Sequence, residues 1–69
     1  MEEDKAKEVG AAIRHYRELR SYSGSALCRE LGINRSTLFL WETGKQLPSP
    51  DNIRRLADIL KVSITELKR

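Results

Sequence analysis

The stretch of sequence that decides the fold is residues 24–43, GSALCRELGINRSTLFLWET. Apolar residues stand at helical spacing on both sides of Gly32: Leu27, Leu31, Ile33, Leu38 and Trp41. Two helices joined by so short a turn cross steeply only where a small residue lies between them and the turn residue tolerates a positive φ. Cys28 is small, and Gly32 adopts a positive φ at the least cost. The stretch therefore predicts two short helices that cross at a sharp turn.

Capping residues mark the ends of these two helices. Ser23 is a suitable N-cap for a helix over residues 24–31, and Gly32 fits the C-terminal end of that helix. Asn34 is the N-cap candidate of the second helix, which Gly44 ends. Both helices are thus bounded by residues that stabilise helix ends.

The sequence on either side of this stretch has the same helical periodicity. A helix over about residues 5–20 is predicted by one apolar stripe: Val9, Ile13, Tyr16 and Leu19. Ser49 and Pro50 open a further helix with an apolar inward face: Ile53, Leu56, Ala57 and Leu60. The capping box S-I-T-E at residues 63–66 opens a short last helix. With no alternating strand pattern, repeat or linker, the expected fold is all-α, with five helices in a single domain over residues 1–69.

Composition is that of one soluble globular domain without an active site. The chain has 69 residues, of which 39% are hydrophobic and 33% charged. No apolar run approaches the ~18 residues of a membrane span, and no signal-peptide core follows Met1, so we expect a cytoplasmic protein. Lone Cys28 and His15 form neither an internal disulfide nor a zinc site, and His15 lacks a catalytic partner at a suggestive spacing. We therefore expect no metal, no cofactor and no catalysis.

Charge is unevenly distributed along the chain. Residues 1–4 contain three acidic residues and no basic one, and we expect them to be a disordered leader. Residues 5–69 contain all thirteen basic residues and carry a net charge of +6. A basic body of this kind favours a polyanionic partner such as nucleic acid.

Taken together, these residues resemble the phage lambda repressor/Cro-like (Xre-type) helix-turn-helix family. The likeness covers about residues 8–68 and rests on Ile13, Arg14, Arg17, residues 27–38 and 41–45, Pro48, Ile53, Leu56, Ala57, Leu60, Val62, Ser63, Glu66 and Leu67. The resemblance implies a five-helix fold whose third helix enters the major groove of double-stranded DNA. It also implies a homodimeric regulator of transcription, prokaryotic or phage-encoded and associated with the nucleoid.

The recognition helix would begin after Asn34, which places Arg35 and Ser36 nearest the base edges. Arginine can donate two hydrogen bonds to guanine O6 and N7, whereas Ser36 could contact a base or a phosphate. Phe39 and Leu40 would project away from the core, where family members often carry polar residues. Their expected contacts are thymine methyl groups, and the alternatives are partial burial against neighbouring helices or a protein interface.

Contacts to phosphate are expected at the helix starts and in the loop after the recognition helix. The candidates are Ser23, Gly24, Ser25, Asn34, Thr37, Lys45, Gln46 and Asn52. Gly24 departs from the family, which commonly carries glutamine there to bind phosphate and support the recognition helix. Backbone amides, with the hydroxyls of Ser23 and Ser25, would have to take that role. Arg54 and Arg55 are further candidates, or merely solvated charges.

The resemblance also implies a structural pair between Arg17 and Glu42, which would tie the first helix to the end of the recognition helix. The main hypothesis is a sequence-specific DNA-binding regulator, a repressor that acts as a homodimer, with the last helix as a candidate dimer surface. The alternative is an antitoxin or adaptor that binds mainly a protein partner. Gly24, Phe39 and Leu40 suggest this alternative.

Overall fold

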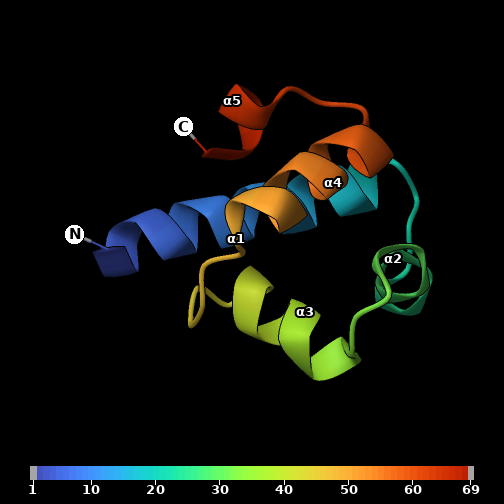
Figure 1. Ribbon diagram of the computed structural model, residues 1–69, viewed down its shortest axis with the longest axis horizontal. Coiled ribbons are helices and arrows are strands. Elements are labelled where there is room, and N and C mark those ends of the chain that lie inside the picture. Colours follow the sequence, from blue (N-terminus) through green and yellow to red (C-terminus); the bar gives the residue numbers. More distant parts are fainter. Residues whose placement is uncertain (1, 69) are drawn as a thin grey trace.

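Five helices make up the described part of the chain. The structure is a computed structural model that describes the backbone of residues 2–68 and the side chains of residues 4–68. The helices are α1 (Glu2–Leu19), α2 (Gly24–Leu31), α3 (Arg35–Glu42), α4 (Pro50–Leu60) and α5 (Ile64–Lys68), and residues 2–68 contain no strand. In Figure 1, α4 and α5 lie on one side of the long helix α1, and α2 and α3 lie on the other. The expected all-α fold of five helices is confirmed.

A single apolar core joins these helices. Its buried residues come from all five: Val9, Ile13, Leu27, Cys28, Leu31, Leu38, Trp41, Ile53, Leu56, Ala57, Leu60 and Leu67. Helix α1 packs against α3, α4 and α5, and α2 packs against α3 and α4. Burial of these side chains is the main favourable term for a chain of this size, at roughly 1.5–3 kcal/mol for each large apolar side chain.

The apolar stripe of α1 ends earlier than the sequence predicted. Tyr16 packs against the core, but Leu19 is 58% exposed. Arg20 lies beyond the helix, and its guanidinium donates to the main-chain oxygens of Leu60 (2.8 Å) and Lys61 (3.3 Å) at the end of α4. The last turn of α1 thus approaches α4 through a polar contact, and the expectation that Leu19 belongs to the core was wrong.

Most predicted caps are present. The Ser23 hydroxyl accepts the N–H of Ala26 at 3.0 Å, and Gly32 has φ +69°, as its place at the end of α2 requires. Ser49 caps α4 in the same way, by accepting the N–H of Asn52 at 3.2 Å. Asn34 occupies the N-cap position of α3, but its side chain makes no capping hydrogen bond. The start of α3 therefore lacks the side-chain cap that Ser23 and Ser49 supply to α2 and α4.

The two terminal helices differ in how closely they follow the prediction. The capping box is reciprocal: the N–H of Ser63 donates to Glu66 Oε1 (2.8 Å), and the N–H of Glu66 donates to Ser63 Oγ (3.1 Å). At the other end, α1 begins at Glu2 and not near residue 5. Residues 2–4 are therefore helical and not the disordered leader that the sequence predicted. Met1 lies outside the described residues.

Helix α1 crosses the end of α3 at Gly10, a contact that the periodicity did not reveal. A Cβ on Gly10 would lie 2.1 Å from the main-chain oxygen of Trp41 and 3.0 Å from that of Glu42. Only a residue without a side chain permits this approach. The contact fixes the distance between α1 and α3, and so the placement of α3 on the domain.

Candidate nucleic-acid interface

One side of α3 is free of the core. Leu38 and Trp41 are buried, whereas Arg35, Ser36 and Phe39 on the outer side are exposed. Phe39 exposes 61% of its surface, an unusual value for a large aromatic side chain. Helix α3 lies at the edge of the molecule, on the far side of α1 from α5 (Figure 1). Its outer side is thus a surface that a partner can reach.

Leu40 is less exposed than expected. It is half-buried, and its main-chain oxygen accepts the N–H groups of Lys45 (2.9 Å) and Gln46 (3.2 Å). These bonds fold the loop after α3 back onto the end of the helix. Of the predicted apolar pair, Phe39 is therefore the more exposed member, and Leu40 lies closer to the loop.

Cys28 lies at the crossing of α2 and α3, as its small size predicted. It is 4% exposed, and its thiol donates to the main-chain oxygen of Asn34 over 3.5 Å. Burial raises the pKa of the Cys28 thiol, and the nearby cation of Arg35 opposes this only in part. The thiol is therefore neutral and weakly nucleophilic at neutral pH, as befits a packing residue.

A carboxylate–guanidinium pair fixes the C-terminal end of α3. Arg17 Nε donates to Glu42 Oε2 at 2.6 Å and Arg17 Nη2 donates to Glu42 Oε1 at 3.2 Å, so the pair is bidentate. The third contact of the guanidinium is a bond from Nη1 to the main-chain oxygen of Tyr22 at 3.0 Å. The hydrogen bond to Glu42 raises the pKa of Arg17 despite the opposing effect of burial. The expected pair is present and joins α1, α3 and the segment before α2.

The N-terminal end of α3 meets the first turn of α2 through Arg35. Its Nη1 donates to Ser25 Oγ at 2.8 Å, and its guanidinium lies against Gly24. Helices α2 and α3 have no acidic residue in their first turns. Among the ion pairs of residues 4–68, none involves Arg35. The cation is thus held at two helix starts without an opposite charge.

The remaining candidates for phosphate contact occupy three places. Ser23 and Asn34 precede α2 and α3, and Thr37 is half-buried in the first turn of α3. Lys45 and Gln46 are exposed in the loop, and Asn52 is half-buried in the first turn of α4. The candidates therefore lie at the starts of α2 and α3, in the loop after α3 and at the start of α4.

Lys7 is a basic residue that the sequence reasoning missed. It is exposed on α1 and lines a shallow hollow with Thr43, Gly44 and Lys45. Two lysines from distant parts of the sequence thus flank the loop after α3. The only signal in the sequence was a basic residue in the first helix, and nothing local placed it beside the loop.

Two arginines of α4 have partners within the domain. Arg55 Nη2 donates to the main-chain oxygen of Leu31 at 2.8 Å and so caps the end of α2. Arg54 Nη1 lies 3.5 Å from Asp51 in an exposed pair. Arg55 therefore has a structural partner that the sequence did not predict.

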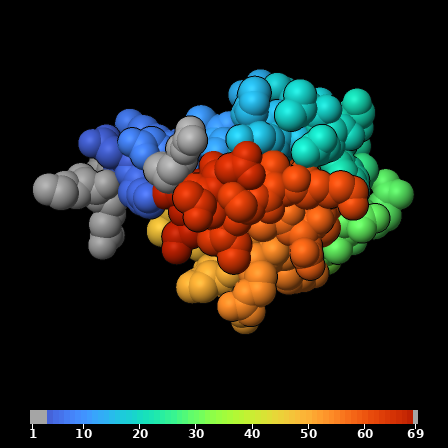
Figure 2. Space-filling view, turned by 90° about the horizontal axis from the view of Figure 1, so that it is seen from above, coloured from blue at the N-terminus to red at the C-terminus, as the bar shows by residue number. Residues whose placement is uncertain are grey.

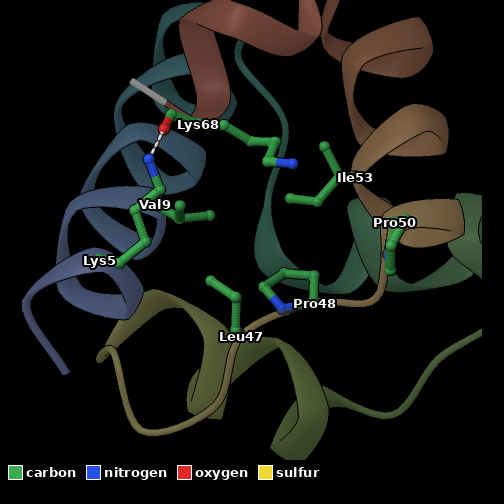
Figure 3. Close-up of a pocket in the computed structure, with 7 residues that line it drawn as sticks. All are labelled: Lys5, Val9, Leu47, Pro48, Pro50, Ile53 and Lys68. Carbon is green, nitrogen blue, oxygen red and sulfur yellow. Dashed lines mark hydrogen bonds between the residues drawn. The ribbon is translucent and has the colours of Figure 1, made fainter. Parts of the chain in front are cut away.

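His15 makes a packing contact, and a small cavity beside the loop after α3 has mainly apolar walls. His15 is exposed and packs edge-on against Tyr16, with the ring centres 4.9 Å apart. Residues 4–68 hold no cluster of three metal-ligating side chains. The cavity, of about 90 Å³, lies where the loop closes on α1 (Figure 3), lined by Lys5, Val9, Leu47, Pro48, Pro50, Ile53 and Lys68. Its walls are mainly apolar, and these seven residues include no acid–base pair.

A second open hollow lies between α1 and α5. It is lined by Glu8, Ala11, Ala12, His15, Tyr16, Glu66 and Leu67. Figure 2 shows α5 lying alongside α1 on this face, and the neighbouring Ile64 is 42% exposed. No helix of the described residues is both long and apolar enough to cross a membrane. The α1–α5 face is thus a partly apolar surface separate from α3.

Comparisons with known proteins agree with this geometry. A family model described as Helix-turn-helix matches residues 13–67. The uncharacterized HTH-type transcriptional regulator YazB of Bacillus subtilis (strain 168) is 40% identical over 58 residues, which are 84% of each chain. The crystal structure of the restriction-modification controller protein C.AhdI from Aeromonas hydrophila superposes with a TM-score of 0.84 at 28% identity. That superposition covers 93% of this chain and 97% of the other.

Proposed function

This chain belongs to the helix-turn-helix family of DNA-binding transcriptional regulators, of the lambda-repressor-like (Xre) type, and we propose that it is a sequence-specific repressor that binds DNA as a homodimer. The observation that carries the proposal is the outer side of α3, where Arg35, Ser36 and Phe39 are exposed together. An α-helix with one exposed side fits the major groove of B-DNA. A dimer bound there would exclude other proteins from the DNA that it covers, which is the basis for proposing repression.

Base reading would be shared by three side chains of α3. The Arg35 guanidinium would donate to O6 and N7 of one guanine, and a good bidentate contact contributes about 1–3 kcal/mol of discrimination. Phe39 would pack against a thymine methyl group, which removes exposed aromatic surface from water. Ser36 would donate to a base or a phosphate. Leu40, being half-buried, would contribute less contact than Phe39.

Contacts to phosphate would fix the domain on the duplex. The exposed N–H groups at the start of α2, with Ser23 and Ser25, would face one strand. Lys7 would contact the DNA backbone from α1, and Lys45 and Gln46 from the loop after α3. Asn52 would contact it from α4 and Asn34 from the start of α3. Such contacts carry no sequence information, and they make affinity fall steeply with salt. Without the family's glutamine at position 24, the lysines would supply much of the affinity that comes from phosphate contacts.

The dimer is proposed from size and from the α1–α5 face. The molecule measures 30 × 24 × 20 Å, so one copy is of a size to cover one of two half-sites that lie ~34 Å apart, one helical turn along the DNA. Helix α5 packs on α1 and α4, so a second copy on this face would leave α3 accessible. Ile64 and the hollow beside Leu67 supply apolar surface for such a contact. We expect the dimer to act in the cytoplasm, at the nucleoid.

Selection of binding sites from random duplexes tests this proposal. The wild-type chain should enrich a two-fold symmetric site, and Arg35→Ala should abolish the preference for one guanine in each half-site. Failure to enrich any sequence, or an identical site with Arg35→Ala, would remove the basis for base reading. Sedimentation of the protein with the enriched duplex should give two chains per duplex, and one chain would contradict the dimer.

A second candidate function is binding to a protein, as an antitoxin or adaptor does. The exposure of Phe39 favours it, because aromatic side chains are enriched in the cores of protein interfaces. Affinity purification would distinguish the two functions. A stoichiometric protein partner that is lost with Phe39→Ala, together with no salt-dependent DNA binding, would support the adaptor and exclude the repressor.

A further inference from the structure

The guanidinium of Arg35 rests flat on Gly24. A Cβ placed on Gly24 would lie 3.2 Å from each of Arg35 Cζ, Nε and Nη2. These three atoms lie in the plane of the guanidinium, so their equal distances mean that one face of the group covers the glycine. A Cβ at position 24 would be closer than ordinary contact, so the guanidinium would have to shift by a few tenths of an ångström. The first residue of α2 therefore sets the plane of an arginine that belongs to α3.

Ser25 sets the rotation of the guanidinium within that plane. Arg35 Nη1 donates to Ser25 Oγ at 2.8 Å. A guanidinium has five N–H donors, so this bond leaves most of them open. No carboxylate of residues 4–68 forms an ion pair with the group. Two neighbouring residues of α2 thus fix the orientation of a cation whose other donors remain available to a ligand.

From this geometry we propose that Gly24 and Ser25 determine base specificity by positioning Arg35, an inference that rests on the proposed function. Holding a long side chain in one orientation before binding removes part of the entropy that binding would otherwise cost. The benefit is greatest for a planar fork that must meet two acceptors of one guanine at once, and smaller for an arginine that meets a phosphate at variable angles. Gly24 and Ser25 are positioning residues, because in this arrangement neither needs to touch the base.

The test uses Gly24→Ala, Ser25→Ala and Ser25→Thr in the full chain. Because the methyl of Gly24→Ala meets only the end of an exposed, flexible side chain, the variant should fold, and thermal melting checks this. The guanine that Arg35 reads is the one whose preference Arg35→Ala abolishes in selected duplexes, by about tenfold to a hundredfold. Gly24→Ala and Ser25→Ala should each lower that same preference several-fold, with preferences at the other positions unchanged. Ser25→Thr, which keeps the hydroxyl, should keep the guanine preference of the wild type.

A double-mutant comparison provides the control. In an Arg35→Ala background, Gly24→Ala and Ser25→Ala should have no further effect on the preference at that base pair. Equal losses with and without Arg35 would overturn the inference, because the two residues would then act through the backbone. A wild-type guanine preference that persists in both single variants would overturn it as well, while leaving the proposed function intact. A wild-type chain that selects no sequence would overturn both.

Discussion

Gly10→Ala should destabilise the domain, although alanine is ordinarily the better helix residue. The new Cβ would lie 2.1 Å from the main-chain oxygen of Trp41. A carbon–oxygen contact needs about 3.3 Å, so α1 and the end of α3 would have to separate by about 1 Å. That oxygen also accepts the N–H of Gly44 at 3.1 Å. The separation would therefore loosen the loop after α3 as well as the core.

The size of the effect follows from two opposing terms. Overpacking a close-packed contact costs typically 1–3 kcal/mol, and we expect the upper end here because the atom struck belongs to the backbone. Replacing glycine by alanine within a helix returns up to about 1 kcal/mol. The net loss should be about 2 kcal/mol in the free energy of unfolding. For a domain of this size that lowers the melting temperature by roughly 8–16 °C.

Thermal and urea unfolding followed by circular dichroism would measure this loss. Gly24→Ala is the matched control, because its Cβ meets only the Arg35 side chain at 3.2 Å and should leave stability equal or slightly higher. A Gly10→Ala variant as stable as the wild type, or more stable, would refute the close approach of α1 to α3.

Three further predictions concern Glu42 at the end of α3, Cys28 in α2 and Lys45 in the loop after α3. Glu42→Gln should cost about 3 kcal/mol, because it leaves the mostly buried Arg17 without its charge partner, and urea unfolding should show this at both low and high salt. Burial raises the pKa of the Cys28 thiol in the folded state, so the thiol's contribution to the free energy of unfolding is complete below the ordinary thiol pKa of about 8.5 and declines as pH rises above it. Between pH 8 and 10, the free energy of unfolding should therefore fall more steeply with pH in the wild type than in Cys28→Ala. An equal fall in both proteins would contradict the burial of the thiol. Lys45→Ala should weaken binding to all duplexes alike and reduce the slope of log affinity against log salt by about 1, whereas Lys61→Asn, at the end of α4, should leave that slope unchanged.

The parts of the fold that local signals govern were predictable from the sequence. Ser23, Gly32 and Ser49 lie where the backbone itself demands a cap or a positive φ, so their residue types reveal their roles. The core followed from periodicity in the same way, because a buried stripe repeats every three or four residues. Cys28 was recognisable because a steep crossing requires a small residue at a set distance from the turn.

Contacts between distant segments were not predictable in this way. Gly10 sits within a regular helical pattern, and only the position of α3 makes its missing side chain necessary. Arg55 caps a carbonyl 24 residues away, which no local spacing encodes. For the candidate site, the sequence identified Arg35 and Phe39 on the outer side of α3. It did not reveal that Gly24, which departs from the family, makes room for the guanidinium of Arg35.

The central claim is that the outer side of α3 reads DNA, and a crystal structure of the protein with its selected duplex tests it most directly. The account predicts two chains on one duplex, each with α3 in the major groove and the Arg35 fork on a guanine. Phe39 should lie against a base edge and be shielded from water. A structure in which Phe39 and the rest of the outer side of α3 are covered by protein, with the duplex elsewhere, would contradict the account.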